Sequence, residues 1–508
     1  MLIRRAMLFA VCATVVAGLT MAVPAVAAPS SAEDRASARL DALRAGPDGL
    51  AEFLRAFPKG GDLHNHLSGA VSTESLIRYS VADGLCIDKA TLTASAPPCT
   101  ATQRPASDTN TDKAFYSAVL RAWSMEGFDP NGPESGHDHF FATFGKFVAA
   151  TDRHKGDMLA EVADIARRQN QFYLETLISR QGSAVRALAT KTGFDADFAV
   201  MRRKMLDGGA MAKIVTAAQA DTDADYAQFD AALKCGTPAA SRTCVFPKRY
   251  DYQVGRATDP EVVFAHLLLG FELGQVDGRY VGVNLVQPEG DPIALRDYHL
   301  HMTMVGFLRK LYPKTRVTLH AGELTPELVP PADILFHIRE AVEIAGAERI
   351  GHGVAVRHET NAAQLAREMA DRHVLVETPL TSNAQILGVS GPEHPMRWYQ
   401  RFGVPIGLAT DDAGVSRSDI TADYVRAVTE QHQTYRQLKR ISRASLDHGF
   451  IQGASLWRGP DDFRPVAACA GSVLGGANPG QRCKQLLHDS PKAAAEWAQE
   501  AAFRALES

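Results

Sequence analysis

The sequence has little excess charge of either sign, no internal repeat and no second long apolar run, and these shortages exclude whole classes of protein. Its 54 Lys and Arg stand against 58 Asp and Glu, so charge gives no reason to expect nucleic-acid binding. After residue 28, no stretch approaches the ~20 unbroken apolar residues that a membrane span needs. The 508 residues suffice for one large domain with insertions, or for two domains.

The single long apolar run lies at the N-terminus and is organised like a secretory signal. Arg4 and Arg5 precede apolar residues 6–23, and Ala25-Val26-Ala27 follows as a cleavage site. We therefore expect residues 1–28 to be a signal peptide and the protein to be secreted. A membrane anchor is the alternative, but the Ala-rich, Pro-interrupted end of the run argues against it. Arg4-Arg5 also resembles a twin-arginine signal, which leaves the export route open.

Cysteine is scarce. The chain has seven cysteines, of which Cys12 would be removed with the signal. No C-x-x-C occurs, which disfavours free or metal-binding thiols as the role of the other six. In an exported chain, six cysteines in three close pairs favour local disulfides, although other pairings stay open. The three expected bridges are Cys86–Cys99, Cys235–Cys244 and Cys469–Cys483.

Eight short runs have the composition of β-strands. Most are consecutive apolar residues, as expected of parallel strands that are buried on both faces. Helical patterns lie between several of them, for example at 334–345 and 360–372. This alternation predicts an α/β fold, a (β/α)8 barrel of the TIM type. The eight runs are 61–67, 172–178, 212–218, 280–286, 316–320, 349–353, 374–378 and 404–409.

Two connections between these runs are too long for ordinary crossovers. We expect insertions at about 68–171 and 221–279, after strands 1 and 3, and such insertions usually shape the mouth of a barrel. Residues 29–57 are predicted to form an N-terminal helical extension, and 491–506 an amphipathic helix. The barrel with its insertions would then occupy residues 58–508.

Histidine and aspartate recur at the C-terminal ends of these predicted strands. His64 and His66 are two residues apart on one strand, so their side chains point to the same side. Together with His320 and Asp411 they offer three nitrogens and one oxygen, a set that suits a zinc ion with a position left for water. We therefore predict one zinc ion per chain. The other His-x-His pairs, at 137/139 and 299/301, are interpreted as ordinary helix or loop histidines.

Three further polar residues accompany this set. Glu323 follows His320 beyond a glycine that permits a tight turn, and a carboxyl beside a metal can move protons. His352 lies between two glycines and can orient an attacking hydroxide. A loop carboxylate and a satisfied buried histidine are the respective alternatives. Asp411 and Asp412 reach one site only if the chain turns there, so that one binds metal and the other binds substrate.

Five motifs in this order resemble the adenosine deaminase family, particularly its exported growth-factor-related and bacterial members, over about residues 58–450. They are 58–67 (PKGGDLHNHL), 320–323 (HAGE), 351–353 (GHG), 380–383 (LTSN) and 410–412 (TDD). The resemblance implies a barrel that converts adenosine to inosine and ammonia, with zinc on His64, His66, His320 and Asp411. It also implies that Glu323 protonates purine N1, that His352 orients the attacking hydroxide and that Asp412 binds purine N7. Exported members of the family often pair through N-terminal helices, which implies a homodimer.

Two positions depart from the family pattern. Ser68 stands where the family usually has an Asp that binds the ribose 5′-hydroxyl. A carboxylate there would repel a 5′-phosphate, whereas a serine hydroxyl would not, so AMP or another 5′-substituted adenosine is an alternative substrate. Serine can equally bind a plain hydroxyl. Gln287 stands where a glycine amide commonly faces purine N3, and a glutamine amide can take that place if the backbone is unchanged.

Two other interpretations remain. The first is another amidohydrolase, and many of these bridge two metals with a modified lysine on the fourth strand. The run 280–286 contains no lysine, which disfavours this reading. The second is a secreted binding or signalling protein whose enzymatic activity has been lost. Such a loss would remove a ligand or Glu323, and all of these residues are present.

Overall fold

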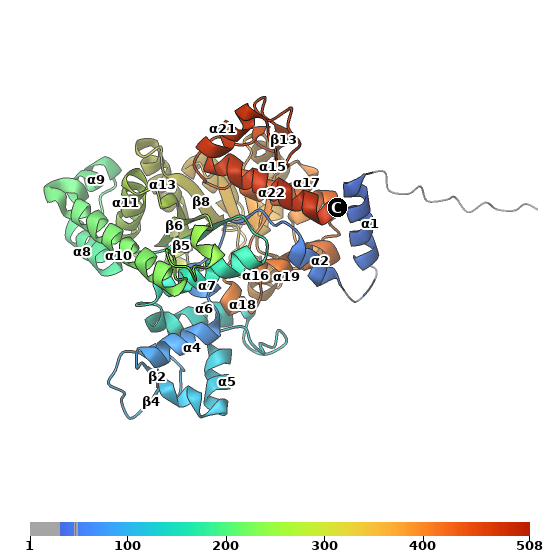
Figure 1. Ribbon diagram of the computed structural model, residues 1–508. Coiled ribbons are helices and arrows are strands. Elements are labelled where there is room, and N and C mark those ends of the chain that lie inside the picture. Colours follow the sequence, from blue (N-terminus) through green and yellow to red (C-terminus); the bar gives the residue numbers. More distant parts are fainter. Residues whose placement is uncertain (1–30, 45, 47–48) are drawn as a thin grey trace, which may run out of the picture.

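In the computed structural model, which describes residues 31–44, 46 and 49–508, eight parallel strands form one sheet that curls into a barrel (Figure 1). The bridge between Asn65 and Asp411 joins the first strand to the last, with hydrogen bonds from Asp411 N to His64 O (2.9 Å) and from His66 N to Asp411 O (3.1 Å). This confirms the predicted barrel. In sheet order the strands are β1 (Gly61–Asp62), β5 (Tyr173–Ile178), β6 (Lys248–Gly255), β7 (Tyr280–Val286), β8 (Arg316–Ala321), β9 (Arg349–His352), β10 (Leu375–Thr378) and β11 (Ile406–Leu408).

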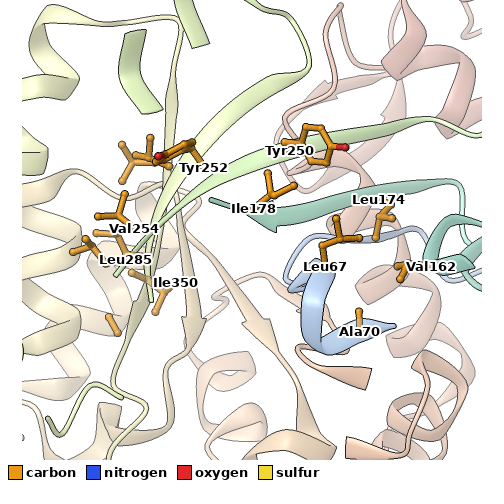
Figure 2. Close-up of a cluster of buried hydrophobic side chains, with 14 of the residues drawn as sticks. Leu67, Ala70, Val162, Leu174, Ile178, Tyr250, Tyr252, Val254, Leu285 and Ile350 are labelled. Atoms are coloured by element: carbon orange, nitrogen blue, oxygen red, sulfur yellow. The ribbon is translucent and has the colours of Figure 1, made fainter. Parts of the chain in front are cut away.

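The strands are buried because helices surround the barrel on the outside and side chains fill its interior. All seven residues of β7 are buried, which explains why its sequence is an almost unbroken apolar run. Figure 2 shows the packed side chains, with Leu285 of β7 near Val254 of β6. The helices that follow the strands include α7 (Lys155–Arg168), α11 (Pro260–Val276), α12 (Pro292–Arg296), α13 (Tyr298–Leu311), α15 (Ala362–Asp371), α17 (Met396–Arg401), α19 (Ile420–Thr429) and α20 (Tyr435–Asp447).

The helical patterns at 334–345 and 360–372 are both confirmed. The first forms α14 (His337–Glu340), which continues as a π-helical turn over Ala341–Ala345, and the second forms α15. Shorter helices lie at the C-terminal ends of strands, where the chain turns away from the barrel. They are α3 (Leu67–Ala70), α16 (Leu380–Leu387) and α18 (Ala413–Ser416).

The strand predicted at 212–218 is wrong, because this segment lies within helix α10 (Ala210–Ala232). Its buried residues, Met211, Ile214, Val215, Ala218 and Thr222, recur every three to four positions, which is the period of a helix. The third strand is β6, and charged residues such as Arg249 and Asp251 interrupt its apolar pattern. Residues 221–279 therefore contain the third strand and α11 and are not an insertion after that strand. The long excursion, made of α8 (Gly182–Thr192), α9 (Phe198–Leu206) and α10, precedes it.

The first insertion, at 68–171, is present as expected. Much of it forms a lobe beside the barrel, with a small sheet and the disulfide Cys86–Cys99 (Figure 1). The insertion then returns through α6, which packs against α16. Gly136, the first residue of α6, has to be glycine because a Cβ there would lie only 1.9 Å from Gln385 O. The elements of the insertion are α4 (Thr73–Ala82), β2 (Cys86–Asp88), β3 (Ala94–Ser95), β4 (Gln103–Pro105), α5 (Lys113–Ala122) and α6 (Gly136–Phe147), and its last helix is the barrel helix α7.

The two ends of the described chain pack together on the outside of the barrel (Figure 1). The predicted extension forms α1 (Ala32–Arg44) and α2 (Leu50–Ala56), and the predicted C-terminal helix is α22 (Pro491–Glu507). Lys439 of α20 joins these ends through ion pairs with Glu33 (3.0 Å) and Glu507 (2.6 Å). Near α22 lie β12 (Trp457–Gly459), β13 (Asp462–Pro465) and α21 (Gln481–Asp489).

All three expected disulfides are present, the other two being Cys235–Cys244 and Cys469–Cys483. The predicted signal peptide, residues 1–28, lies outside the described residues. In the described part of the chain, no helix has the length and apolar character required to cross a membrane.

Candidate active site

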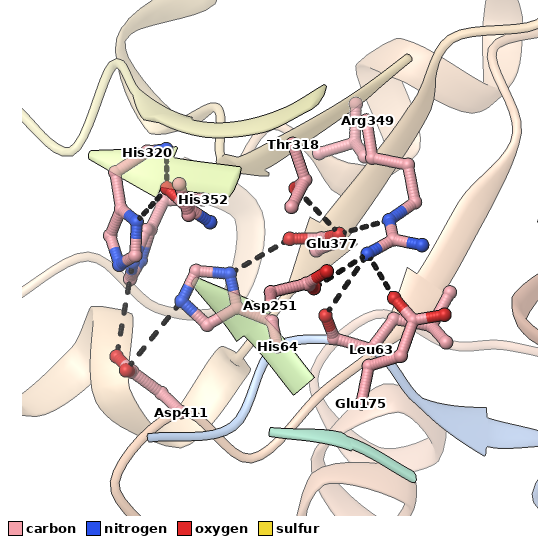
Figure 3. A network of polar contacts seen from close by, with 12 residues as sticks. Leu63, His64, Glu175, Asp251, Thr318, His320, Arg349, His352, Glu377 and Asp411 are labelled. Carbon is pink, nitrogen blue, oxygen red and sulfur yellow. Dashed lines mark hydrogen bonds and ion pairs between the residues drawn. The ribbon is translucent and has the colours of Figure 1, made fainter. Parts of the chain in front are cut away.

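Four side chains from three strand ends converge on one point at the C-terminal end of the barrel. His66 Nε2 lies 3.2 Å from His320 Nε2 and 3.3 Å from Asp411 Oδ1, and His64 Nε2 lies 3.6 Å from the same oxygen. All four residues are buried. His64 and His66 follow β1, His320 belongs to β8 and Asp411 follows β11, so the sequence-predicted ligand set is brought together as one cluster. Figure 3 shows His64, His320 and Asp411 of this set.

Each of the three imidazoles is fixed by a hydrogen bond at its other nitrogen. His64 Nδ1 contacts Glu377 Oε2 (2.8 Å), His66 Nδ1 contacts Gln253 Oε1 (2.9 Å) and His320 Nδ1 contacts Asn284 Oδ1 (2.8 Å). Each partner atom accepts a hydrogen bond, so the ring proton stays on Nδ1 and the Nε2 lone pair points to the common centre. Sequence reasoning did not identify these partners, and the only signal was a polar residue within each buried strand.

The donor set fits a divalent metal ion. Three imidazole lone pairs and a carboxylate oxygen face one another, an arrangement that is repulsive unless a cation lies between them. His64 Nε2 is buried and has no hydrogen-bond partner among the described residues, which is unusual for a polar atom inside a protein. Three nitrogens and one oxygen are ligands that zinc prefers.

A buried charge network supports this centre from within the barrel. Glu377 accepts hydrogen bonds from Thr318 Oγ1 (3.0 Å) and Arg349 Nε (2.6 Å) through the oxygen that does not contact His64. Burial would raise the pKa of Glu377, but Arg349 and His64 together hold it below its ordinary value. The Arg349 guanidinium also pairs with Glu175 and Asp251 (Figure 3). His64 is therefore anchored to an ionised carboxylate.

Glu323 is held beside the centre by its backbone. The buried carboxylate of Glu289 accepts hydrogen bonds from Gly322 N (2.9 Å) and Glu323 N (2.7 Å), and its position is fixed by His337 Nδ1 (2.6 Å). The Glu323 side chain then reaches within 3.7 Å of His352 Nε2. Burial and the nearby Asp411 carboxylate raise the pKa of Glu323 well above its ordinary value. This carboxyl is consequently suited to carry a proton.

The chain turns after β11, so Asp411 and Asp412 face one site. Asp411 has a φ of 58°, in the left-handed region, and its Oδ2 accepts a hydrogen bond from Ser382 Oγ (2.6 Å). Asp412 is buried, and its Oδ1 has no hydrogen-bond partner among the described residues. Gly69 allows α3 to pass closely over it, because a Cβ at that position would lie 1.7 Å from Asp412 Oδ1. Asp412 is thus available to a ligand.

A cavity of about 540 Å³ opens onto this centre and has the size of a small-molecule site. Helix α6 of the first insertion supplies an aromatic wall to it, made of Phe140, Phe141 and Phe144. Ser68 and Gln287 also line the cavity, as do His66, Gln253, His320, Glu323, Asp411 and Asp412. No lysine or arginine occurs among the described residues that line it. The sequence predicts that this insertion shapes the mouth of the barrel, but which of its side chains line the cavity depends on how the insertion folds back.

Gln287 contacts the backbone beside the cavity. Its Oε1 accepts a hydrogen bond from Ala257 N (2.9 Å), and its own backbone has a φ of 80°. The positive φ explains why glycine would suit this position. The expected contact of Gln287 with a purine therefore remains a prediction.

Comparisons with known proteins give sequence relatives that match part of the chain. The adenosine deaminase family profile matches residues 281–455. An adenosine deaminase of Shewanella loihica is 34% identical over 136 residues, and one of Clostridium perfringens is 30% identical over 136 residues. Each alignment covers 27% of this chain and 38% of the relative, so the chain matches less than two fifths of the length of these relatives.

Solved structures share the architecture over a longer span. Arabidopsis ADAL complexed with IMP has a TM-score of 0.50 and 16% identity, covering 79% of this chain and 94% of its own. The Arabidopsis N6-mAMP deaminase MAPDA has a TM-score of 0.50 and 17% identity, covering 79% and 96% respectively. At these identities the likeness concerns the fold alone. The profile match runs from β7 to beyond the end of α20 and contains His320, Glu323, His352, Asp411 and Asp412. His64 and His66 lie outside the match and complete the cluster. Over residues 281–455 the chain is therefore similar to the adenosine deaminase family.

Proposed function

We propose that this protein is an exported, zinc-dependent deaminase that hydrolyses adenosine to inosine and ammonia. The observation that carries the proposal is the convergence of His64, His66, His320 and Asp411 beside Glu323, at the floor of a cavity of about 540 Å³. Three neutral imidazoles and one carboxylate suit a zinc ion, which when bound lowers the pKa of a water molecule to about 7.

The chain's own residues divide the proton and binding tasks. Water adds to purine C6, the C6–N6 bond breaks, and the amino group leaves as ammonia. Glu323 is assigned to give a proton to purine N1, because its buried carboxyl has a raised pKa and faces the cavity. His352 Nε2, 3.7 Å from Glu323 Oε1, is assigned to hold the attacking water. Burial and Asp411 raise the pKa of Asp412, so its protonated carboxyl can donate to purine N7.

The cavity favours adenosine over AMP. A 5′-phosphate entering it would lose water without meeting a lysine or arginine among the described lining residues, and an uncompensated buried charge is costly. The phenylalanines of α6 offer apolar surface in its place. AMP stays the second candidate because Ser68, a neutral hydroxyl in the cavity lining, does not repel a phosphate.

Export is proposed from two features of the chain. The N-terminal 28 residues have the composition of a secretory signal, and the six remaining cysteines form three disulfides. Disulfides persist in oxidising compartments. The homodimer implied by the family resemblance remains a prediction, and the solution mass of the purified protein would test it.

The function is tested by incubating purified, signal-free protein with adenosine and with AMP in parallel. The fall in absorbance that accompanies loss of the 6-amino group reports turnover. We expect efficient turnover of adenosine, its loss after dialysis against a chelator, and its return with zinc. Turnover of AMP at equal or higher kcat/KM would make the nucleotide the substrate. Turnover of neither by zinc-loaded protein would refute the proposal and favour another amidohydrolase activity.

A further inference from the structure

A row of buried polar groups begins at His352 Nδ1. His352 Nδ1 lies 2.8 Å from Asn383 Oδ1, and Asn383 Nδ2 lies 2.9 Å from His394 Nε2. His394 Nδ1 in turn accepts a hydrogen bond from the backbone N–H of Met396 (3.1 Å). His352, Asn383 and His394 are all almost wholly inaccessible to solvent. The hydrogen-bond partners in this row therefore decide where each proton lies.

The backbone of Met396 sets the direction of the row, because an N–H group can only donate. His394 Nδ1 must therefore carry a lone pair, and the single proton of the neutral ring lies on Nε2. Burial lowers the pKa of His394 to about 3, which agrees with a neutral ring. Consequently His394 Nε2 donates, and the group it faces on Asn383 has to be an acceptor.

The amide of Asn383 can satisfy this requirement in one orientation only. The structure places the Asn383 nitrogen towards His394, so that ring faces two donors and has no place for its own proton. A 180° turn of the amide exchanges its oxygen and nitrogen without moving any other group. With its oxygen towards His394 and its nitrogen towards His352, every group in the row is satisfied. His352 Nδ1 then accepts a hydrogen bond, and the proton of His352 lies on Nε2.

The surroundings of His352 Nε2 agree independently. Two carboxyl oxygens lie close to it, Glu323 Oε1 at 3.7 Å and Asp411 Oδ2 at 3.8 Å. A nitrogen lone pair in that place would face the ionised carboxylate of Asp411, whereas an N–H is attracted to it. No hydrogen bond to His352 Nε2 is made within the described part of the chain, so its proton points into the reaction space.

We propose that Asn383 and His394 are positioning residues that hold His352 in the Nε2–H form, so that His352 donates a hydrogen bond to the attacking water. The proposal deepens the proposed deaminase function and rests on it for the identity of the reaction. It also divides the work at the site. Because His352 has no lone pair at Nε2, it does not take the proton of the water.

The proton positions can be measured without any turnover. Neutron diffraction from perdeuterated, zinc-loaded protein should show deuterium on Nε2 of both His352 and His394. The deuterated amide nitrogen of Asn383 should face His352. Deuterium on His352 Nδ1 would overturn the proposal, whether or not the protein deaminates adenosine. Failure of the deaminase function would appear separately, in the adenosine assay.

A substitution at Asn383 provides a second test. Asn383→Asp replaces the amide with a group that accepts on both sides, so His352 should move its proton to Nδ1 and lose its donor at Nε2. We expect kcat to fall about 10²–10³-fold with little change in KM, since losing a donor of this type has that effect. Zinc content and the thermal transition should stay near those of the wild type. A kcat within about threefold of the wild type would contradict the proposal.

Substitutions of His394 separate positioning from packing. In His394→Gln the amide can still accept from Met396 N–H and donate to Asn383, so this variant should retain more kcat than His394→Leu, which can do neither. Equal losses in the two variants would show that His394 acts only by filling space. His299→Leu, at an exposed histidine of α13, is the matched control and should leave kcat unchanged.

Discussion

His64 Nδ1 and Glu377 Oε2 lie 2.8 Å apart, and this hydrogen bond connects the candidate metal centre to the charged interior of the barrel. The other oxygen of Glu377 accepts from Arg349, whose guanidinium is fully buried and also pairs with Glu175 and Asp251. A buried guanidinium needs such carboxylates, because an unpaired charge in the interior is costly. The same charges thus stabilise the barrel and orient His64, a candidate metal ligand.

Replacing Glu377 should weaken metal binding. In Glu377→Gln the amide can still accept from His64, but the negative charge that compensates Arg349 is lost. Changes in such supporting groups typically lower metal affinity 10–100-fold, and we expect a loss of this size in competition with a chromophoric chelator. Glu368→Gln, which removes a surface partner of Arg372, is the control. An unchanged zinc affinity in Glu377→Gln would mean that the contact does not support the ligand.

Glu323→Gln should retain zinc but lose turnover. The glutamine keeps the shape of the side chain and cannot deliver a proton, so kcat on adenosine should fall about 10²–10⁴-fold. Metal analysis of the purified variant checks that zinc remains. Glu327→Gln changes an exposed glutamate of the same loop and should behave like the wild type. A near-normal kcat in Glu323→Gln would refute the assignment of Glu323 as the proton donor.

Ser68→Asp should shift the substrate preference further towards adenosine. The new carboxylate lines the cavity and would repel a 5′-phosphate, while it can still accept a hydrogen bond from a 5′-hydroxyl. The quantity to measure is the ratio of kcat/KM for adenosine to that for AMP, which we expect to rise at least tenfold. Ser68→Asn, close in size and uncharged, separates charge from shape. The same ratio in Ser68→Asp and the wild type would exclude Ser68 as the residue that discriminates against phosphate.

The C-terminal helix should lose stability as the pH rises through the range 5–8. Burial raises the pKa of Glu496 on α22 to about 8, whereas a glutamate in the unfolded chain has a pKa near ~4.3. Between these values the folded state binds more protons than the unfolded state, so the free energy of unfolding falls as pH increases. Glu496→Gln cannot titrate, and its oxygen can still accept from Leu456 N (2.6 Å).

Thermal scans at several pH values test this. The Tm of Glu496→Gln should match the wild type near pH 5 and exceed it by a few degrees near pH 8. Glu368→Gln should show the same pH dependence as the wild type. A difference between Glu496→Gln and the wild type that does not change with pH would indicate a packing effect and not the titration of Glu496.

The sequence alone predicted the four candidate metal ligands and much of the barrel. His64, His66, His320 and Asp411 follow short apolar runs, and the carboxyl ends of parallel strands meet at one rim of a barrel. The apolar runs were sufficient to predict most strands, because a strand that is buried on both faces is apolar along its length. The prediction failed at β6, where buried Asp251 pairs with Arg349 across the barrel interior, and at 212–218, where local composition did not separate helix from strand. The three disulfides followed from closeness in sequence.

Only the tertiary structure decided what surrounds those ligands. Gln253, Asn284 and Glu377 orient the imidazoles from three other strands, and nothing near them in the sequence marks this role. The aromatic wall of α6 and the row from His352 through Asn383 to His394 likewise join segments far apart in the chain. The reason is physical: a ligand type is a local property of the chain, whereas a hydrogen-bond partner, a cavity wall and a tautomer depend on contacts made after folding.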